Sequence, residues 1–170
     1  MMTLQRLITN LKSVEEGLQR GKFVREALIP RADEIMTFQY QQLFEGKASN
    51  GEDIRPYYSE DVKPNGYFRS KESADRYIAW KQTGIPYPFR ANRNPDAPNL
   101  FITGKFHEEL KVDFGSDSMT IKGGTSYADG IVAKYGIGTF GLSAQSWGEM
   151  INERGVGQDV MNEVIKTINA

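Results

Sequence analysis

The chain contains no cysteine and a single histidine, His107, among its 170 residues. Disulfide bonds, thiolate catalysis and zinc sites built on sulfur are therefore excluded. A metal ion would need hard carboxylate ligands such as Asp113, Asp117 or Asp129, in a pattern that the sequence does not show. We therefore expect no cofactor and no metal, and a fold that depends on burial and assembly.

Long apolar runs are missing as well. No stretch approaches the roughly 18 apolar residues of a membrane span, and residues 1–6 lack the uninterrupted apolar run of a signal peptide. The net charge of −1 demands neither nucleic acid nor an anionic membrane as a partner. We expect a soluble intracellular product that forms a single domain over residues 1–170, with an N-terminal helical segment at 1–30.

The small net charge hides an uneven distribution. Residues 1–54 carry 7 basic and 8 acidic side chains, residues 55–105 carry 9 and 5, and residues 106–170 carry 5 and 9. The basic middle segment also holds 9 of the 19 aromatic residues. Because complementary patches fix register and orientation in assemblies, this pattern suggests attraction between neighbouring copies of the chain.

Hydrophobic spacing predicts the N-terminal elements. Apolar residues three and four apart predict a first helix with one apolar stripe, made of Leu4, Leu7, Ile8, Leu11, Val14 and Leu18. A second helical piece follows and stops at Pro30. In 34–43, Met36, Phe38 and Tyr40 alternate with polar residues, which favours a strand, although 41–44 would also suit a helix.

Turn and strand signals continue beyond that point. Asn50-Gly51 predicts a tight turn, residues 54–58 suit a short partner strand, and 70–82 suits a helix. From 106 to 122 the alternation around Gly115 predicts an antiparallel hairpin, with Phe106, Leu110, Val112 and Phe114 on the buried face and His107 on the wet face.

Proline and glycine mark the remaining boundaries. Residues 83–99 hold four of the seven prolines and predict a long extended loop or arm that could lie on a neighbouring subunit. A short helix is expected over 127–134, ending near Gly136, and Ser143 is expected to cap a terminal helix that Gly155 and Gly157 break in two. The predicted fold is α+β: a small antiparallel β-sheet with N-terminal and C-terminal helices packed on it and a long proline-rich loop.

Catalytic and ligand motifs are weak. We assign a probability below about one in ten that His107 is a catalytic base, because no nucleophile or orienting partner is evident. The alternative is a plain surface histidine. The run from Lys122 to Ser126 has its lysine before its glycines, unlike a phosphate-binding loop, and we interpret it as a turn. These observations predict that the chain is not an enzyme.

The basic aromatic segment at 55–105 leaves two alternatives open. One is nucleic-acid binding through Arg76, Tyr77, Trp80, Lys81, Tyr87, Phe89, Arg90 and Arg93, where rings could stack on bases. The other, about three times as probable, places aromatics at a subunit contact with arginines at the rim. On this second interpretation the candidate subunit-interface residues are Trp80, Tyr87, Phe89, Arg90 and Arg93.

Several short motifs in order carry a family resemblance. They are 42–47 and 49–51 (Gln-Leu-Phe-Glu-Gly-Lys and Ser-Asn-Gly), Tyr57-Tyr58-Ser59, Leu100 with 103–106 (Thr-Gly-Lys-Phe), 134–136 (Lys-Tyr-Gly) and 140–143 (Phe-Gly-Leu-Ser). Over about residues 35–151 the chain resembles small tailed-bacteriophage proteins of virion morphogenesis and tail completion. The proline-rich stretch at 81–99 is longer than the short basic link usual in such proteins.

The resemblance implies a structural protein of the virion at the head-tail junction or upper tail, assembled in the host cytoplasm. It further implies a homo-oligomeric ring, contacts with other phage neck, portal or tail proteins, and no catalysis. Proximity to packaged DNA would be expected, without sequence-specific recognition of nucleic acid.

Overall fold

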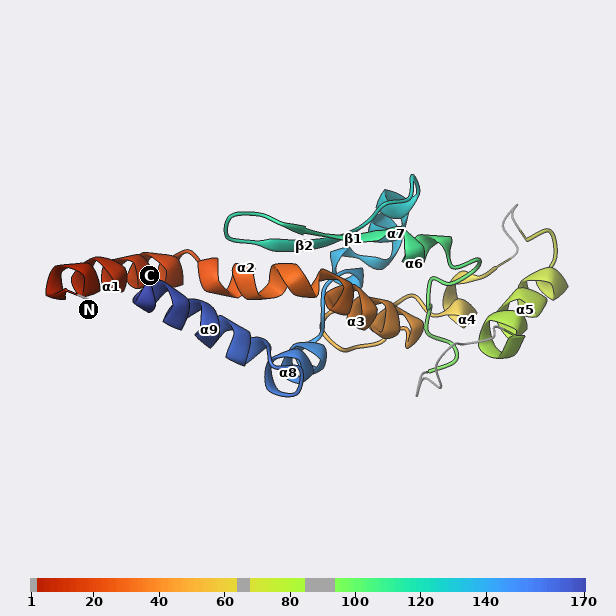
Figure 1. The fold of residues 1–170 in the computed structure, drawn as a ribbon. Coiled ribbons are helices and arrows are strands. Elements are labelled where there is room, and N and C mark those ends of the chain that lie inside the picture. The colour runs from red at the N-terminus through yellow and green to blue at the C-terminus, as the bar shows by residue number, and fades with distance from the viewer. Residues whose placement is uncertain (1–2, 64–67, 85–93) are drawn as a thin grey trace.

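A computed structural model describes residues 3–63, 68–84 and 94–170 (Figure 1). The molecule is elongated, with α1 and the end of α9 at one extremity and α5 at the other. Its helices are α1 (Leu4–Gln19), α2 (Lys22–Leu28), α3 (Ala32–Phe44), α4 (Tyr58–Asp61), α5 (Lys71–Ala79), α6 (Lys105–Glu108), α7 (Ala128–Tyr135), α8 (Ala144–Asn152) and α9 (Val156–Asn169). Shorter helical turns are η1 (Ile29–Arg31), η2 (Trp80–Gly84) and η3 (Ile137–Thr139).

The fold is α+β, with helices packed on a small two-stranded antiparallel sheet, as predicted. Strand β1 (Leu110–Phe114) pairs with β2 (Met119–Gly123), and Val112 lies opposite Ile121. Along β1 burial alternates with exposure, because side chains on a strand point to opposite faces in turn. The hairpin is confirmed, but it begins at Leu110 and not at residue 106, because residues 105–108 form α6.

The predicted strand at 34–43 is wrong, because this segment lies within helix α3. The buried positions are 35, 38, 39, 42, 43 and 44, and positions 35, 38, 39, 42 and 43 follow the three-and-four spacing of one helix face. Two of them are Gln39 and Gln42, whose polar side chains hide the helical period when only apolar residues are counted. The alternation of Met36, Phe38 and Tyr40 with polar residues therefore does not reflect a strand.

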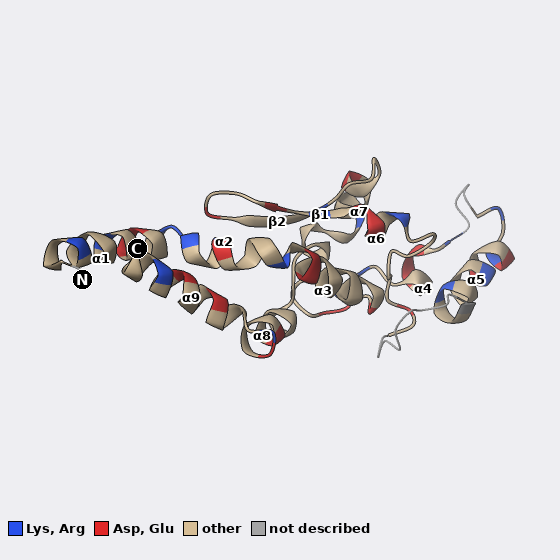
Figure 2. Cartoon of the chain, viewed as in Figure 1, with Lys and Arg blue, Asp and Glu red and all other residues tan. Residues whose placement is uncertain are grey.

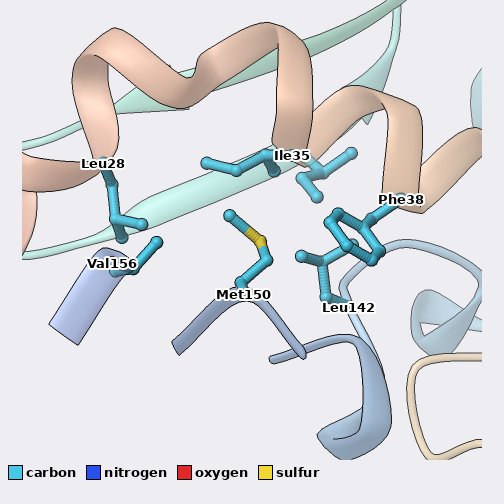
Figure 3. Packing of buried hydrophobic residues seen from close by; sticks show 7 residues of the cluster. Leu28, Ile35, Phe38, Leu142, Met150 and Val156 are labelled. Atoms are coloured by element: carbon cyan, nitrogen blue, oxygen red, sulfur yellow. The ribbon is translucent and has the colours of Figure 1, made fainter. Parts of the chain in front are cut away.

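Helix α3 lies at the centre of the core and packs on both sides. On one side, Ile35 and Phe38 meet the C-terminal helices and β2 (Figure 3). The buried members of this cluster are Leu28, Ile35, Phe38, Ile121, Leu142, Met150 and Val156. On the other side, Leu43 packs with Ile54, Phe106, Leu110 and Ala128. The two clusters join α3 to the sheet, to α7 and to the helices at both ends of the chain.

Helices α1, α2 and α9 form an extension from this core (Figure 1). Helix α9 packs along both α2 and α1, and the Asn10 side-chain amide donates to the Ile168 carbonyl at 2.9 Å. Arg31 pairs with Asp159 near the start of α9 at 2.6 Å. Since residue 31 contacts the start of α9 and residue 10 contacts its end, α9 runs antiparallel to the N-terminal helices.

The remaining C-terminal elements follow the sequence prediction, except that Gly157, which was expected to help break the terminal helix, lies inside α9. Helix α7 ends at Gly136, and the Ser143 hydroxyl accepts from the Ser146 backbone N–H at 3.2 Å as the N-cap of α8. Gly155 separates α8 from α9 with φ +79°, a left-handed conformation that glycine adopts without steric cost.

The short strand predicted at 54–58 is not formed. In its place, Lys47 and Asp53 make an isolated antiparallel bridge, and α4 starts at Tyr58. The tight turn predicted at Asn50-Gly51 is confirmed, because the Gly51 N–H donates to the Ala48 carbonyl at 2.9 Å. The helix predicted at 70–82 is confirmed over α5, which η2 extends as a π-helical turn.

Candidate functional site

Trp80 is the predicted interface residue that the structure describes. It begins η2, and 39% of its surface is exposed. Its ring packs against Tyr77, with 5.9 Å between ring centroids. The other four, Tyr87, Phe89, Arg90 and Arg93, lie outside the described residues, as does most of the predicted arm at 83–99.

Lys81, one residue further, is buried with 1% of its surface exposed. Its ammonium donates to the Asn99 side-chain oxygen at 2.9 Å and to the Phe101 carbonyl. Lys81 precedes the proline-rich segment, whereas Asn99 and Phe101 stand at its end. A single ammonium group therefore joins the two ends of that segment.

Helix α4 supplies the third member of this contact. The Tyr58 hydroxyl donates to the Asn99 side-chain oxygen and accepts from the Asn99 backbone N–H, both at 3.1 Å. Lys81 Nζ also lies 5.2 Å from the centroid of the Tyr58 ring. We call Tyr58, Lys81 and Asn99 the anchor, since they are all buried and together fix the base of the 83–99 segment.

The anchor removes Lys81 from the set of residues that could contact nucleic acid. Lys81 was one of the basic residues considered for phosphate contact, but its charge is directed inward to oxygen atoms of the protein. Arg76 on α5 remains exposed, and Tyr77 is half-buried. The described part of the basic aromatic segment therefore presents fewer cations to a ligand than the sequence indicated.

A cavity of about 350 Å³ lies beside the anchor, between α5, the 100–104 segment and α7. Aromatic and aliphatic side chains dominate its lining, which consists of Tyr58, Tyr77, Lys81, Leu100, Ile102, Thr103, Gly104, Phe106, Tyr127, Ile131 and Tyr135. Burial raises the pKa of the Tyr135 hydroxyl, which stays protonated near neutral pH. These lining residues include no carboxylate and no imidazole, and their titratable side chains are Lys81 and the tyrosines.

His107 is not on a wet strand face, as the sequence predicted, but is buried in α6 with 4% of its surface exposed. Its ring lies among four aromatic rings, Tyr40, Phe44, Phe101 and Phe106, at centroid distances of 4.8, 5.1, 5.6 and 5.7 Å. Strand alternation failed here because the backbone turns into a helix before β1.

The environment of His107 keeps its imidazole neutral. Burial lowers the pKa of His107 to about 4, the nearby Asn99 carbonyl opposes this by favouring the charged form, and the Lys81 charge lowers it further. Neither ring nitrogen makes a hydrogen bond of good geometry within the described residues. The single histidine is thus a neutral core residue, far from the role of a surface base.

Large apolar side chains are exposed along the whole length of the molecule. Helix α1 exposes Leu4, Ile8, Leu11 and Leu18, and other elements expose Val24, Ile29, Trp80, Ile102, Tyr127, Ile137, Ile151, Met161 and Ile165. The highest exposed fractions are 81% at Ile137 and 74% at Leu4. The stripe predicted on the first helix is therefore split, with Val14 buried and its other members mostly in solvent.

Two kinds of site are not found within the described residues. No group of three or more histidine and carboxylate side chains lies close enough to hold a metal ion. Over the same residues, no helix has the length and apolar character needed to cross a membrane.

No protein-family model matches the chain. No curated protein and no solved structure matches it either. Functional assignment therefore depends on the residues and the geometry described above.

Reasoning from the sequence did not find the anchor or predict the burial of Lys81. Tyr58 and Asn99 carry no local signal of a joint role, because they lie 41 residues apart. A useful hint was the position of Lys81 itself, which follows an aromatic run on a helix and immediately precedes the proline-rich segment.

Proposed function

We propose that this chain is a non-enzymatic structural subunit of a tailed-bacteriophage virion, a tail-completion or connector protein of the head-tail junction or upper tail. It assembles in the host cytoplasm as a homo-oligomeric ring and contacts other neck, portal or tail proteins. The family resemblance suggests the location of the subunit in the particle. The exposed apolar surface of the molecule suggests that the subunit assembles with neighbours.

The exposed apolar side chains are the observation that carries this proposal. Soluble monomers expose single apolar residues commonly, but contiguous apolar faces mark interaction surfaces. On α1, four large aliphatic side chains lie on one face of a single helix, and Leu18 alone is 60% exposed. Further exposed residues at Trp80, Ile102 and Ile137 lie on elements remote from α1 in the chain, so more than one surface is available for neighbours.

Contacts between the motifs of the resemblance add support. The segments 42–51 and 136–143 lie far apart in sequence, yet the Gln42 side chain binds the Gly141 carbonyl at 2.8 Å and the Ser143 N–H at 2.8 Å. The Ser49 N–H also donates to the Gly138 carbonyl at 2.7 Å. Two of the short motifs are thus parts of one packed unit, as expected if they belong to a common fold.

The test is the mass of the purified protein in solution, measured by light scattering across concentration at low and high salt, with negative-stain imaging of the same samples. We expect a closed assembly of about six or twelve copies, since heterologous contacts close into rings. A monomer at every concentration would overturn the ring. A parallel measurement with single- and double-stranded DNA covers the alternative function, because phosphate contacts weaken steeply as salt rises.

A further inference from the structure

We propose that the proline-rich residues 85–89 of one copy bind a tyrosine-lined groove on a neighbouring copy. The inference rests on the proposed homo-oligomer and adds to it the contact that joins two subunits. A loop on one surface and a groove on another make a heterologous contact, and its repetition from copy to copy closes into a ring.

The groove is formed by two adjacent cavities. The cavity of about 350 Å³ beside the anchor adjoins a second cavity of about 340 Å³, which is bordered by α4, α5 and α7. Residues that line both cavities join them into one groove, and these are Tyr58, Tyr77, Ile102 and Tyr135. We call it the tyrosine groove.

The floor of the tyrosine groove is buried, whereas its rim is exposed. Tyr58 and Phe106 are only 5% and 4% exposed. The Tyr58 and Tyr77 rings meet edge to face, with an interplanar angle of 89° and 6.3 Å between their centroids. At the rim, Ile102 and Tyr127 are 60% and 49% exposed. A concave aromatic surface with an exposed apolar rim is typical of a binding site.

The charges around the groove favour an apolar ligand over a polyanion. Among the described residues of its lining, Asp61 of α4 pairs with Lys134 of α7. The Lys81 ammonium is directed to oxygen atoms of the protein. Helix α5, which forms one wall, carries both basic and acidic residues (Figure 2). A protein segment of low charge therefore suits this groove better than nucleic acid does.

The aromatic lining selects a proline-rich segment. Grooves lined by aromatic side chains bind such segments, because proline keeps the backbone extended before binding and little conformational entropy is lost. The chain contains this kind of segment at residues 85–89, whose sequence is Ile-Pro-Tyr-Pro-Phe. Each proline also favours extended backbone in the residue before it. Tyr87 and Phe89 add two rings that can pack against the tyrosines of the groove.

The base of this loop is held beside the groove. Lys81, which lines the groove, binds Asn99, and the Gln82 side-chain amide donates to the Asp96 carboxylate at 3.3 Å. These bonds close the base of a loop over residues 83–95. Folded at its middle, a loop of this length reaches about 20 Å from its base. Since its prolines favour extended backbone, we expect the loop to lead away from its own groove and to reach a neighbour.

Two variants separate the loop from the groove. Tyr87→Ser/Phe89→Ser alters the loop alone, and Ile102→Glu places a charge in the groove at a position that is 60% exposed. We expect each variant to be monomeric by light scattering. An equimolar mixture should form a dimer, because one loop-to-groove contact is restored in each pair, and a mixture that stays monomeric overturns the proposal. Unchanged circular dichroism shows that each variant folds.

A labelled peptide of residues 83–93 tests the ligand directly. Fluorescence anisotropy measures its binding to the Tyr87→Ser/Phe89→Ser protein, whose own loop lacks both rings. Binding should weaken by about ten-fold or more when the peptide carries serine at positions 87 and 89, or when the protein also carries Ile102→Glu. Equal binding of the two peptides overturns the proposal.

The matched control for the groove is Ile137→Glu in the same protein. Ile137 is 81% exposed and is not among the described residues that line either cavity. The same charge at this position should leave the affinity for the peptide unchanged. A loss equal to that of Ile102→Glu would show that the groove is not the binding site.

The outcomes bear on the two proposals separately. A ring that persists in both variants overturns the loop-to-groove contact and leaves the ring intact. A dimer of the unaltered protein that both variants dissociate supports the contact, as two loops exchanged between copies, and overturns the ring. An unaltered protein that is monomeric at every concentration overturns both, even where the peptide binds, because the loop then occupies the groove of its own chain.

Discussion

The side-chain oxygen of Gln42 on α3 accepts a hydrogen bond of 2.8 Å from the backbone N–H of Ser143, the N-cap of α8, across 101 residues of sequence. The Gln42 amide donates to the Gly141 carbonyl, and its neighbour Gln39 accepts from the Gly141 N–H at 2.7 Å. Two buried glutamines thus provide hydrogen-bond partners for backbone groups of the 141–143 segment, which is not part of a β-sheet. The position of the C-terminal helices depends on these bonds.

Replacing Gln42 by leucine should lower the free energy of unfolding by about 1–3 kcal/mol, because the buried Ser143 N–H and the partly buried Gly141 carbonyl lose their partners. Urea denaturation followed by circular dichroism measures the change. Gln41→Leu makes the same chemical change at the adjacent exposed position and should alter the stability by less than about 0.5 kcal/mol. Equal effects at the two positions would contradict the role assigned to Gln42.

Stability should fall as the pH is lowered, because of His107. The folded-state pKa is about 4, below the ordinary value of 6.5, so the fold favours the neutral ring. The contribution of this group is fully present above pH 6.5 and is lost as the pH falls towards 4, with a total of about 3 kcal/mol from 1.36 kcal/mol per pKa unit. Because His107 is the sole histidine, its titration by NMR is unambiguous.

The matched variant is His107→Leu, which removes the imidazole from the same aromatic cluster. The difference in unfolding free energy between pH 7 and pH 4.5 should be smaller in this variant than in the unaltered protein by about 2 kcal/mol. An NMR titration of His107 with a midpoint near 6.5 in the folded protein would refute the buried, neutral state.

Tyr58→Phe should weaken the anchor. The change deletes one hydroxyl and leaves the buried Asn99 N–H without its partner, at a cost of about 1–2 kcal/mol. Amide hydrogen exchange at Asn99 and Phe101 should accelerate more than exchange in β1. Tyr127→Phe is the control, because Tyr127 is 49% exposed, and the change should have little effect on either measurement. Exchange at Asn99 that is equally slow in both variants would count against the anchor.

Two glycines near the hairpin should respond oppositely to alanine. A Cβ atom at Gly124 would lie 2.5 Å from the Glu109 carbonyl oxygen, a contact that requires backbone movement, so Gly124→Ala should destabilise the fold by about 1–3 kcal/mol. Gly130 in α7 has no atom within 4 Å of such a Cβ, and alanine there should stabilise the helix by up to about 1 kcal/mol. Thermal unfolding of the two variants provides the comparison, and shifts of the same sign would contradict it.

The close approach at Gly124 also explains the glycine pair after Lys122. The sequence interpretation preferred a turn to a phosphate loop there, and the structure gives the pair a packing role. At Gly123 an added Cβ would meet the Ala128 side chain at 2.6 Å, so the glycine lets α7 lie directly on β2.

The sequence by itself determined the elements whose signals are local. The hairpin of β1 and β2 followed from alternation, Ser143 was found as a cap because a hydroxyl before a helix can accept a backbone N–H, and Gly136 and Gly155 marked helix ends. These features depend on residues within a few positions of one another, so a linear pattern contains them.

Only the tertiary structure decided the state of α3, Lys81 and His107. Gln39 and Gln42 count as polar in any pattern, and they become core residues because the 139–143 segment supplies their hydrogen bonds. Lys81 is turned inward by Asn99 and Phe101, and the single histidine is held neutral by four rings from three segments of the chain. Helix α1 is the converse case, because the sequence predicted an apolar stripe there and the fold left most of it in solvent. Each outcome depends on partners distant in sequence, and no local spacing specifies such partners.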